Sequence, residues 1–464
     1  MPLIKSISGI RGTIGEKQGE NLSSVDIIKF TSAFAQLITK DKSNAKIVIG
    51  RDGRTSGKMV RDIVVKGITD LGINIVDLGL TTTPTVAIAV KEENADGGII
   101  ITASHNPQDW NALKFLNSEG EFISSKLGEL VLQIAENPTS TETTSKGKVI
   151  LDDSYFQKHI DGVVNYPLVN AEAIANQNYK IVVDGINSTG ATYVPALLKA
   201  LGVNDIIVIN AEVNGKFAHN PEPLPEHLRE LSNEVVKQNA DLGIAVDPDV
   251  DRLCFVCEDG SMFGEEYTLV AVADYLLSKR KGSTVSNLSS TRALKDITEK
   301  QGCNYFASAV GEVNVVEKMK EVNAVIGGEG NGGIIVPDFH YGRDALIGIG
   351  LFLTHLSAHV KGINSLRKTY PDYFMLKNKI ALNTGIHEHN GGIEVGKLFE
   401  KIKNKYRNNP VNMEDGLKIE FDKDWVHLRS SNTEPIIRIY AESNLETAAE
   451  NIARRLMQDI GECL

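Results

Sequence analysis

The sequence lacks the features of secreted and membrane proteins. Its 4 cysteines in 464 residues are too few for a disulfide framework. The longest apolar run, Ala345 to Leu353, is far too short to span a bilayer. Residues 1–14 contain no basic stretch followed by a long apolar core, as a secretory leader would. We therefore expect a cytoplasmic protein with no membrane partner.

Positive charge is also scarce. The 49 Lys and Arg residues are outnumbered by 60 Asp and Glu residues, which gives a formal net charge of −11. Nucleic acids and anionic membranes are bound through basic patches, so neither is an expected partner. Any phosphate that this chain binds must be held by a local cluster of cationic side chains.

The two cysteines nearest in sequence do not form a predicted metal or redox pair. Cys254 and Cys257 lie in or beside a strand-like run, Leu253 to Val256. Side chains three residues apart in a strand point to opposite faces. A shared zinc or redox role is therefore not expected.

The chain is long enough for several domains and contains a repeated pattern. Its 464 residues suggest three or four domains, at roughly 100 to 200 residues per domain. A strand, a Ser/Thr-containing loop, a helix and a glycine turn into another strand begin at residue 46, at residue 180 and, more weakly, at residue 284. A βαβ unit needs neighbouring strands, so the repeat predicts three α/β domains of similar build.

The pattern changes at the expected domain boundaries. Residues 137–146 are polar without an apolar period, which is typical of a linker. After about Tyr370 the strands become shorter, and residues 445–460 have the spacing of an amphipathic helix, which predicts a smaller α+β domain. The expected domains are residues 1–145, 150–256, 257–370 and 371–464.

The first motif with chemical potential is Thr-Ala-Ser-His-Asn-Pro at residues 102–107, directly after the strand-like residues 98–101. A serine at the end of a buried strand, followed by His105 and Asn106 and stopped by proline, is presented on a loop. We expect the Ser104 hydroxyl to be accessible. For this segment alone, a polar turn with local backbone hydrogen bonds is the alternative.

Three aspartates follow another apolar strand at residues 242–246. They are Asp247, Asp249 and Asp251, in the sequence Asp-Pro-Asp-Val-Asp-Arg. Alternate carboxylates leaving a strand can converge on one hard cation, and Mg²⁺ prefers oxygen ligands. Mutual repulsion disfavours three uncompensated carboxylates in an ordinary turn. Arg252 can hold one aspartate or a phosphate through two hydrogen bonds.

Two other kinds of site have a similar run of aspartates. An EF-hand loop requires glycine where Arg252 stands, and a helix instead of a strand before it. An aspartyl phosphatase resembling the haloacid dehalogenase family also has an apolar strand that ends in Asp-x-Asp. This second alternative stays open on these residues alone.

Three further loops contain groups suited to a sugar phosphate. Residues 327–333 surround Glu329 and Asn331 with glycines, so backbone and side chains can approach sugar hydroxyls closely. Their glycine spacing does not fit a dinucleotide-binding loop. Residues 428–435, Leu-Arg-Ser-Ser-Asn-Thr-Glu-Pro, offer many donors to a phosphate. Residues 8–13 place Arg11 between two glycines. A flexible surface loop is the alternative for residues 327–333, and a structural Ser/Asn turn before a strand is the alternative for residues 428–435.

The chain resembles the α-D-phosphohexomutase family over essentially its whole length. The resemblance rests on five motifs in the family order: Ser-Gly-Ile-Arg-Gly, Thr-Ala-Ser-His-Asn-Pro, Asp-Pro-Asp-Val-Asp-Arg, Gly-Glu-Gly-Asn-Gly-Gly and Arg-Ser-Ser-Asn-Thr-Glu-Pro. It implies an α/β fold with three related α/β domains plus a smaller C-terminal α+β domain around a central cleft. It also implies an isomerase that moves a phosphoryl group between two hydroxyls of a hexose phosphate.

The resemblance also implies roles for individual residues. Ser104 carries the phosphoryl group, and its phosphate ligates Mg²⁺ together with Asp247, Asp249 and Asp251. The residues expected near the reacting phosphoryl are Arg11, His105, Lys114 and Arg252, and which of them is the general base stays open. Sugar contacts are expected from Glu329 and Asn331. Contacts to the phosphate that does not react are expected from Arg429, Ser431, Asn432 and Thr433.

The expected small-molecule partner is a sugar phosphate, with a hexose or hexosamine 1,6-bisphosphate as intermediate and activator, and the chain is expected to be a monomer or homodimer. Typical bacterial phosphoglucosamine mutases carry Gly-Glu-Gln-Ser-Gly-His and Arg-Pro-Ser-Gly-Thr in the two loops where this chain departs. Its loops look more like a branch common in archaea and some anaerobic bacteria. We expect glucosamine 6-phosphate and glucosamine 1-phosphate as substrates. Glucose or mannose phosphates, a phosphatase and a non-catalytic sugar-phosphate-binding protein are the alternatives.

Overall fold

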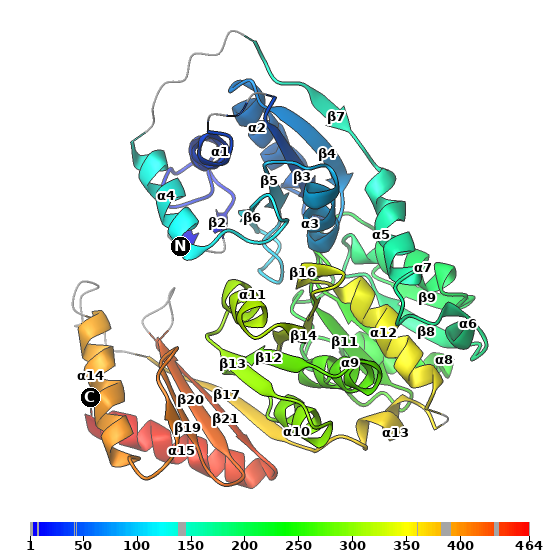
Figure 1. Cartoon of the computed structure of the whole chain (residues 1–464), viewed down its shortest axis with the longest axis vertical. Coiled ribbons are helices and arrows are strands. Elements are labelled where there is room, and N and C mark those ends of the chain that lie inside the picture. The colour runs from blue at the N-terminus through cyan, green and yellow to red at the C-terminus, as the bar shows by residue number, and fades with distance from the viewer. Residues whose placement is uncertain are drawn as a thin grey trace.

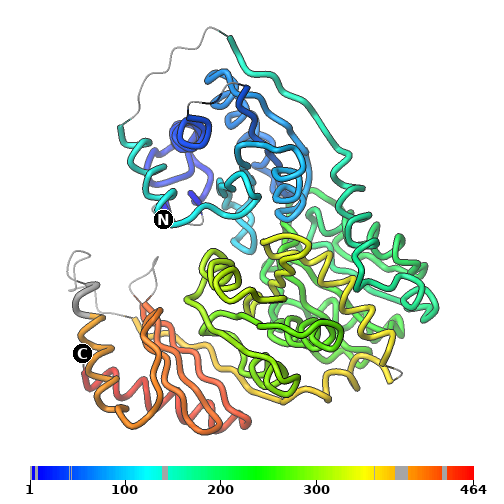
Figure 2. The backbone as a smooth tube through the Cα atoms, viewed as in Figure 1, coloured from blue at the N-terminus to red at the C-terminus, as the bar shows by residue number. Residues whose placement is uncertain are grey.

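A computed structural model describes residues 3–6, 9–40, 42, 44–137, 145–359, 361–381, 391–430 and 436–463, with the backbone alone for 391–394. Four sheets follow one another along the chain and form an arc, in which the first and fourth units lie on the same side of the molecule (Figures 1 and 2). This arrangement confirms the predicted α/β fold with a smaller last unit.

The first unit is built on a seven-stranded sheet in the order β1-β2-β6-β5-β3-β4-β7. Alternate residues of its strands face separate cores: Ile47 and Ile49 belong to one cluster and Val48 to the other. This period of two explains why helices cover both faces. The elements are β1 (Ile4–Ser6), β2 (Gly9–Thr13), α1 (Ser24–Ile38), β3 (Lys46–Arg51), α2 (Gly57–Thr69), β4 (Asn74–Leu80), α3 (Thr83–Glu92), β5 (Gly97–Ile101), β6 (Trp110–Leu116), α4 (Ser125–Glu136) and β7 (Val149–Leu151).

The second unit has a four-stranded sheet in the order β11-β10-β8-β9, in which β10, β8 and β9 are parallel and β11 is antiparallel. Cys254 and Cys257 of β11 belong to different hydrophobic clusters, so the predicted opposite orientation of their side chains is confirmed. The elements are α5 (Ser154–Val164), α6 (Ala171–Ala175), β8 (Lys180–Asp184), α7 (Gly190–Ala200), β9 (Asp205–Ile209), α8 (Arg229–Gln238), β10 (Leu242–Val246) and β11 (Leu253–Cys257).

The third unit has a five-stranded sheet in the order β13-β12-β14-β15-β16, whose last two strands are antiparallel additions to a parallel core. The apolar run that begins at Ala345 forms a buried helix. The elements are α9 (Glu265–Lys279), β12 (Ser283–Asn287), α10 (Ala293–Lys300), β13 (Tyr305–Ser308), α11 (Glu312–Glu321), β14 (Ala324–Glu329), β15 (Gly333–Val336), β16 (His340–Arg343), α12 (Ala345–Ser357) and α13 (Ile363–Arg367).

The fourth unit has an antiparallel sheet in the order β17-β21-β20-β19-β18. The predicted C-terminal helix is present as α15, and its residues Ala449, Ala453, Leu456 and Ile460 are buried at helical spacing. The elements are β17 (Phe374–Ala381), α14 (Gly391–Lys405), β18 (Val411–Asn412), β19 (Leu417–Glu420), β20 (Trp425–Ser430), β21 (Ile436–Ser443) and α15 (Glu446–Cys463).

The predicted βαβ repeat is present three times, as β3-α2-β4, β8-α7-β9 and β12-α10-β13, each with its two strands paired in parallel. The second and third units share one hydrophobic cluster that runs from Ile160 to Tyr370. Inside it the rings of Phe255 and Phe352 stack at 3.8 Å between centroids. In the part of the chain that the structure describes, no helix is both long and apolar enough to cross a membrane.

Candidate active site

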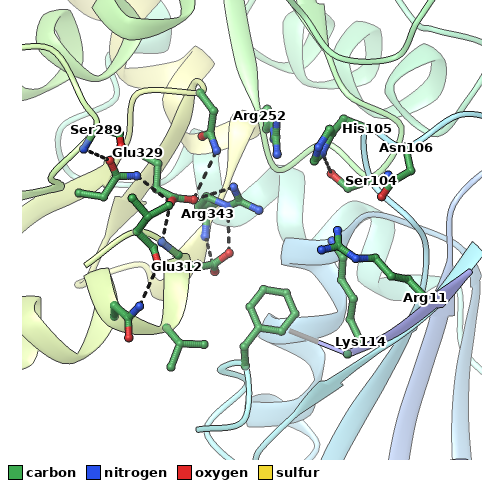
Figure 3. Close-up of a pocket in the computed structure, with 18 of the residues that line it drawn as sticks. Arg11, Ser104, His105, Asn106, Lys114, Arg252, Ser289, Glu312, Glu329 and Arg343 are labelled. Atoms are coloured by element: carbon green, nitrogen blue, oxygen red, sulfur yellow. Dashed lines mark hydrogen bonds and ion pairs between the residues drawn. The ribbon is translucent and has the colours of Figure 1, made fainter. Parts of the chain in front are cut away.

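A cleft of about 820 Å³ is lined by residues from all four units. The residues predicted from the sequence that line it are Arg11, Ser104, His105, Lys114, Arg252, Glu329, Asn331 and Arg429. The carboxylates of Asp247, Asp249 and Asp251 are fully buried. The three predicted phosphate contacts Ser431, Asn432 and Thr433 lie outside the described residues. Figure 3 shows Ser104, His105 and Arg11 on one side of the cleft, and Glu329 and Glu312 on the other.

The serine loop follows β5 and turns sharply at Ser104. Ser104 has a left-handed backbone conformation with φ 47°, which is unfavourable for a residue with a Cβ atom. Its N–H donates to Thr102 Oγ1 at 2.9 Å, and the Thr102 hydroxyl donates to Asp52 Oδ2 at 2.6 Å. The Ser104 hydroxyl donates in turn to Asp247 Oδ2 at 2.6 Å. The serine loop of the first unit therefore meets the aspartate loop of the second.

Arg54, in the loop after β3, fixes the shape of the serine loop. Its guanidinium is fully buried and donates to four backbone carbonyls, those of Ser104 at 2.5 Å, Asn106 at 2.6 Å, Pro107 at 2.6 Å and Trp110 at 2.9 Å. Its Nε also donates to Asp52 Oδ2 at 3.2 Å. A guanidinium has five N–H donors in a rigid, planar arrangement. One side chain can therefore donate to several buried backbone carbonyls that have no partner in a β-sheet.

The aspartate loop has the donor set of a cation site. Ligand atoms of Asp247, Asp249 and Asp251 lie within 4.8 Å of one another. One oxygen of Asp249 is held by Lys114 Nζ at 2.8 Å, and one oxygen of Asp251 by Arg343 Nη2 at 2.7 Å. Their other oxygens, Oδ1 in both residues, are buried and have no hydrogen-bond partner among the described residues. Buried carboxylate oxygens need a partner, and a hard divalent cation such as Mg²⁺ fits them.

The electrostatics of the aspartate loop favour binding of a cation. Burial raises the pKa of Asp247 well above its ordinary value, and the charges of Asp249 and Asp251 raise it further. Burial also acts on Asp249, but the charge and hydrogen bond of Lys114 outweigh it and lower that pKa. The ionised form of Asp247 is thus destabilised by its neighbours, and a cation bound among the three carboxylates would stabilise it.

The first unit positions the aspartate loop directly. The backbone N–H of Thr83, at the start of α3, donates to Asp249 O at 2.9 Å, and its hydroxyl donates to Asp249 Oδ2 at 2.6 Å. In the second unit, the hydroxyls of Ser188 and Thr189 donate to Pro248 O at 2.6 and 2.9 Å. These buried contacts fix the aspartate loop against the start of α3 and against the segment before α7.

Cationic side chains gather around Ser104, as phosphate binding by an acidic protein requires. Arg11, Lys114 and Arg252 all line the same cleft. Burial lowers the pKa of Arg11, and the charges of Arg438 and Arg252, which line the same cleft, lower it further. Arg11 Nε and Arg252 Nε are buried without a hydrogen-bond partner among the described residues. Such a cluster of unsatisfied donors suits a dianionic phosphate.

His105 is held neutral beside the serine. Its Nδ1 lies 3.5 Å from Ser104 Oγ. Burial lowers the pKa of His105 well below its ordinary value of 6.5, and the surrounding charges of Arg252, Arg343, Lys114 and Arg11 act in the same direction. A neutral imidazole at pH 7 can accept a proton, whereas Lys114, whose pKa is raised by Asp249 and Asp251 against the effect of burial, stays charged.

Glu329 is the last residue of β14, directly before the glycine-rich loop that joins β14 to β15, and groups from other segments hold its carboxylate. Glu329 Oε1 accepts from Asn287 Nδ2 at 2.8 Å and from Gly311 N–H at 3.1 Å, and its Oε2 accepts from Arg343 Nη1 at 3.0 Å. Asn331 Oδ1 accepts from Gly333 N–H at 3.1 Å. Glu329 and Asn331, the two predicted residues of the glycine-rich loop at 327–333 (the sugar loop), therefore lie together at one wall of the cleft.

Arg343, at the end of β16, was not identified from the sequence. Besides Asp251 and Glu329, its guanidinium pairs with Glu312 Oε2 at 2.9 Å. A Cβ atom on Gly333 would come within 2.3 Å of Arg343 Cδ, so the glycine leaves room for this side chain. An arginine between glycine and aspartate before an apolar helix is the only sequence signal, and it does not name the partners.

Two other cleft residues also escaped prediction. Glu222 lies in a proline-rich connection and pairs with Arg252 Nη1 through Oε1 at 3.2 Å. Glu312 lies at the start of α11, where burial raises its pKa to about 7 against the charge of Arg343. Neither residue belongs to a recognisable motif, and each is paired with an arginine about 30 residues further along its own unit.

Arg429, at the end of β20, links the fourth unit to the third. Its Nε lies 2.8 Å from Asp415 Oδ2, and the same oxygen accepts from the Val310 N–H at 2.9 Å. Val310 also lines the cleft. The predicted phosphate-binding arginine therefore lies at a contact between units and faces the shared cleft.

Four family models match the chain in order. They are described as phosphoglucomutase/phosphomannomutase α/β/α domain I (residues 3–142), domain II (157–260), domain III (264–373) and C-terminal domain (388–458). A relative from Thermococcus kodakarensis, named phosphoglucomutase/phosphomannomutase, is 32% identical over 447 residues and covers 95% of this chain and 94% of its own. A phosphoglucosamine/phosphogalactosamine mutase from Sulfurisphaera tokodaii is 32% identical over 457 residues, with 97% of each chain covered.

The fold also matches a crystal structure of known family. A phosphoglucomutase/phosphomannomutase family protein from Burkholderia thailandensis superposes with a TM-score of 0.84 at 24% identity, covering 99% of this chain and 98% of that one. At this identity the match concerns the fold alone.

Proposed function

The chain belongs to the phosphoglucomutase/phosphomannomutase family of α-D-phosphohexomutases, which are isomerases, and we propose that it interconverts glucosamine 6-phosphate and glucosamine 1-phosphate. The observation that carries the catalytic part is the hydrogen bond of 2.6 Å from the Ser104 hydroxyl to Asp247. It joins a loop serine to a carboxylate cluster in which two oxygens have no hydrogen-bond partner within the part of the chain that the structure describes. The proposed working units are residues 1–145, 150–256, 257–370 and 371–464.

In the proposed reaction, phosphorylated Ser104 donates its phosphoryl group to the free hydroxyl of the substrate. The substrate oxygen forms a bond to phosphorus, the bond from phosphorus to Ser104 Oγ breaks, and the hydroxyl proton passes through His105 to Ser104 Oγ. We assign this transfer to His105 because its imidazole is neutral and lies 3.5 Å from Ser104 Oγ. The resulting bisphosphate turns over in the cleft and returns its other phosphate by the reverse steps.

The remaining predicted residues serve binding in this proposal. Arg11, Lys114 and Arg252 hold and neutralise the transferring phosphoryl group. Asp247, Asp249 and Asp251 hold Mg²⁺, which when bound supplies positive charge to the transferring phosphoryl. Glu329 and Asn331 bind sugar hydroxyls. Arg429, with Ser431, Asn432 and Thr433, binds the phosphate that does not react, and an enclosed cleft limits hydrolysis.

The proposed sugar is supported by relatives named for amino sugars. Besides the protein from Sulfurisphaera tokodaii, a relative from Pyrococcus furiosus that is 31% identical over 453 residues is named a probable phosphoglucosamine mutase. The relative from Thermococcus kodakarensis favours the second candidate, glucose and mannose phosphates. Both candidates share the same phosphoryl-transfer site, so only the sugar contacts distinguish them.

The test is a comparison of kcat/KM for glucosamine 6-phosphate, glucose 1-phosphate and mannose 1-phosphate, with Mg²⁺ and a bisphosphate primer. We expect a preference of tenfold or more for the glucosamine phosphate, about 1.4 kcal/mol in the transition state. A preference for the neutral hexoses would move the protein to the second candidate. Ser104→Ala should abolish transfer, and full activity in that variant, or steady release of inorganic phosphate, would favour an aspartate-nucleophile phosphatase.

A further inference from the structure

Glu266, in the first turn of α9, reaches the wall of the cleft beside the sugar loop. Its side chain is 12% exposed and lines the cleft. A Cβ atom on Gly330 would lie 2.0 Å from Glu266 Oε2 and 2.4 Å from Oε1. Gly330 stands between Glu329 and Asn331 in the sequence. The carboxylate of Glu266 therefore fills the place that a side chain of the sugar loop would otherwise occupy.

Glu266 has an acceptor to spare, unlike Glu329 and Glu312 in the same wall. Both oxygens of Glu329 are hydrogen-bonded, and both oxygens of Glu312 are held by Arg343. Glu266 Oε2 accepts from the Thr291 N–H at 3.0 Å. Its Oε1 has an ion pair with Lys377 Nζ at 3.9 Å, beyond hydrogen-bond distance.

The other cleft carboxylates are placed differently. Glu222 is paired with Arg252. Glu129 is exposed on α4 of the first unit. Glu266 is thus the carboxylate at the sugar loop that has room for another donor.

The charges around Glu266 leave a local excess of negative charge. Lys377, from β17 of the fourth unit, lies closer to Glu265 than to Glu266, at 3.4 Å. Glu442 of β21 also faces this region and acts on Glu266 in the same sense as Glu265. Burial raises the pKa of Glu266 to about 8, and Lys377 compensates only in part. A carboxyl group with this pKa is largely protonated at pH 7, and a neighbouring cation favours its carboxylate form, so a further cation is the ligand that this corner favours.

We infer that Glu266 is a specificity-determining residue that binds the ammonium group of an amino sugar phosphate beside the sugar loop. The inference rests on the proposed function and names the contact that separates an amino sugar from a neutral hexose. A neutral hexose presents a hydroxyl at the same carbon, which can form an ordinary hydrogen bond with the carboxyl group. An ammonium group forms a charge-assisted hydrogen bond with a carboxylate, which is roughly twice as strong.

Glu265 provides a matched control for this inference. It is the neighbouring residue in α9, is buried and pairs with the same lysine at the shorter distance, but it does not line the cleft. Glu266→Gln and Glu265→Gln each replace a carboxyl group near Lys377 with an amide and keep the shape of the side chain. Only Glu266→Gln removes a carboxyl group from the wall of the cleft beside the sugar loop.

The experiment measures the ratio of kcat/KM for glucosamine 6-phosphate to that for glucose 6-phosphate in the wild type and both variants. Glu266→Gln should lower this ratio tenfold or more, whereas Glu265→Gln should leave it within about twofold. An unchanged ratio in Glu266→Gln, with a wild type that prefers the amino sugar, overturns the inference and leaves the proposed function standing. A wild type that prefers glucose 6-phosphate overturns the proposed function itself.

A binding measurement covers the case in which Glu266→Gln loses activity altogether. Calorimetric titration of Ser104→Ala and of Ser104→Ala with Glu266→Gln gives the Kd for the same two sugar phosphates without turnover. The second substitution should weaken glucosamine 6-phosphate at least tenfold more than glucose 6-phosphate. Equal weakening of both ligands would assign Glu266 a structural role and overturn the inference.

Discussion

At the residue scale, Arg343 is the centre of charge in the cleft wall. Its guanidinium pairs with Asp251, Glu312 and Glu329 at 2.7, 2.9 and 3.0 Å. These carboxylates come from the aspartate loop, from α11 and from the sugar loop, as Figure 3 shows for the latter two. A planar fork can serve three acceptors at once, which an ammonium group on a flexible stem cannot do in the same geometry.

Replacing Arg343 with methionine should therefore be strongly destabilising. Removal of one partner from a buried ion pair typically costs about 3 to 5 kcal/mol, because the other charge stays buried. We expect a clear fall in the urea midpoint at pH 7 for Arg343→Met and a smaller fall for Arg343→Lys. Lys237→Met, which breaks an exposed pair with Glu234, is the control and should leave the urea midpoint close to that of the wild type. Equal midpoints for the Arg343 and Lys237 variants would contradict this reading.

At the element scale, the strands decide where the serine and aspartate loops lie. Ser104 follows β5 and Asp247 follows β10, and both strands end at the same cleft. Parallel βαβ units bring the carboxyl ends of their strands to one edge of a sheet, where polar loops collect. The repeated unit thus explains why each loop lies at the carboxyl edge of its own sheet, whereas the packing of the first unit against the second brings the serine and aspartate loops together.

Arg54 determines the conformation of the serine loop, which follows β5, through its hydrogen bonds to the loop carbonyls. Arg54→Lys should leave two or more carbonyls of residues 104–110 without a donor, and each unmade buried hydrogen bond costs about 1 to 3 kcal/mol. We expect faster hydrogen exchange of the amides in residues 103–110 and a fall in kcat larger than any change in KM. Lys58→Ala, at an exposed position of α2, should change neither. Unchanged exchange in Arg54→Lys would show that the loop is shaped by other contacts.

At the scale of the whole molecule, the fourth unit contacts the third mainly through polar groups. His427 of β20 is buried between Ser289 Oγ, 2.8 Å from Nδ1, and Asp415 O, 2.6 Å from Nε2. A carbonyl can only accept, so Nε2 carries the proton and Nδ1 accepts from Ser289. Arg292 adds a hydrogen bond to Glu420 at 2.6 Å. The interface therefore depends on a neutral histidine.

This interface predicts a pH dependence with a defined sign. Burial lowers the pKa of His427 to about 4, from 6.5 in the unfolded chain. Its contribution to stability is present above pH 6.5 and is lost as the pH falls toward 4, by about 3 kcal/mol at most. The urea midpoint of His427→Gln should therefore lie further below that of the wild type at pH 7.5 than at pH 5.

His219 supplies the control of opposite sign. Burial lowers its pKa, but the hydrogen bond and charge of Asp184 outweigh burial and raise it. Its contribution is present below pH 6.5 and is lost as the pH rises through the folded pKa. The difference between the wild type and His219→Gln should be larger at pH 5. The same pH trend for both histidine variants would contradict the assignments.

Local pattern was enough to predict the repeated βαβ units and the loops that contain Ser104, Asp247 and Glu329. These features depend on residues close in sequence: strand periodicity, glycine turns and polar residues directly after a strand. The cationic cluster that phosphate binding requires was predicted from net charge alone, and Arg11, Lys114 and Arg252 were predicted from family motifs.

Only the tertiary structure identified Arg343, Glu266 and Arg54 as partners of those loops. Arg343 lies 92 residues from Asp251, and Arg54 lies 50 residues from Ser104. None of the three residues belongs to one of the five family motifs. The sequence predicted that Gly330 and Gly333 allow close approach to a ligand. In the structure they leave room for the side chains of Glu266 and Arg343. Charge pairing between separate units depends on how those units pack, and packing geometry cannot be derived from the local order of residues.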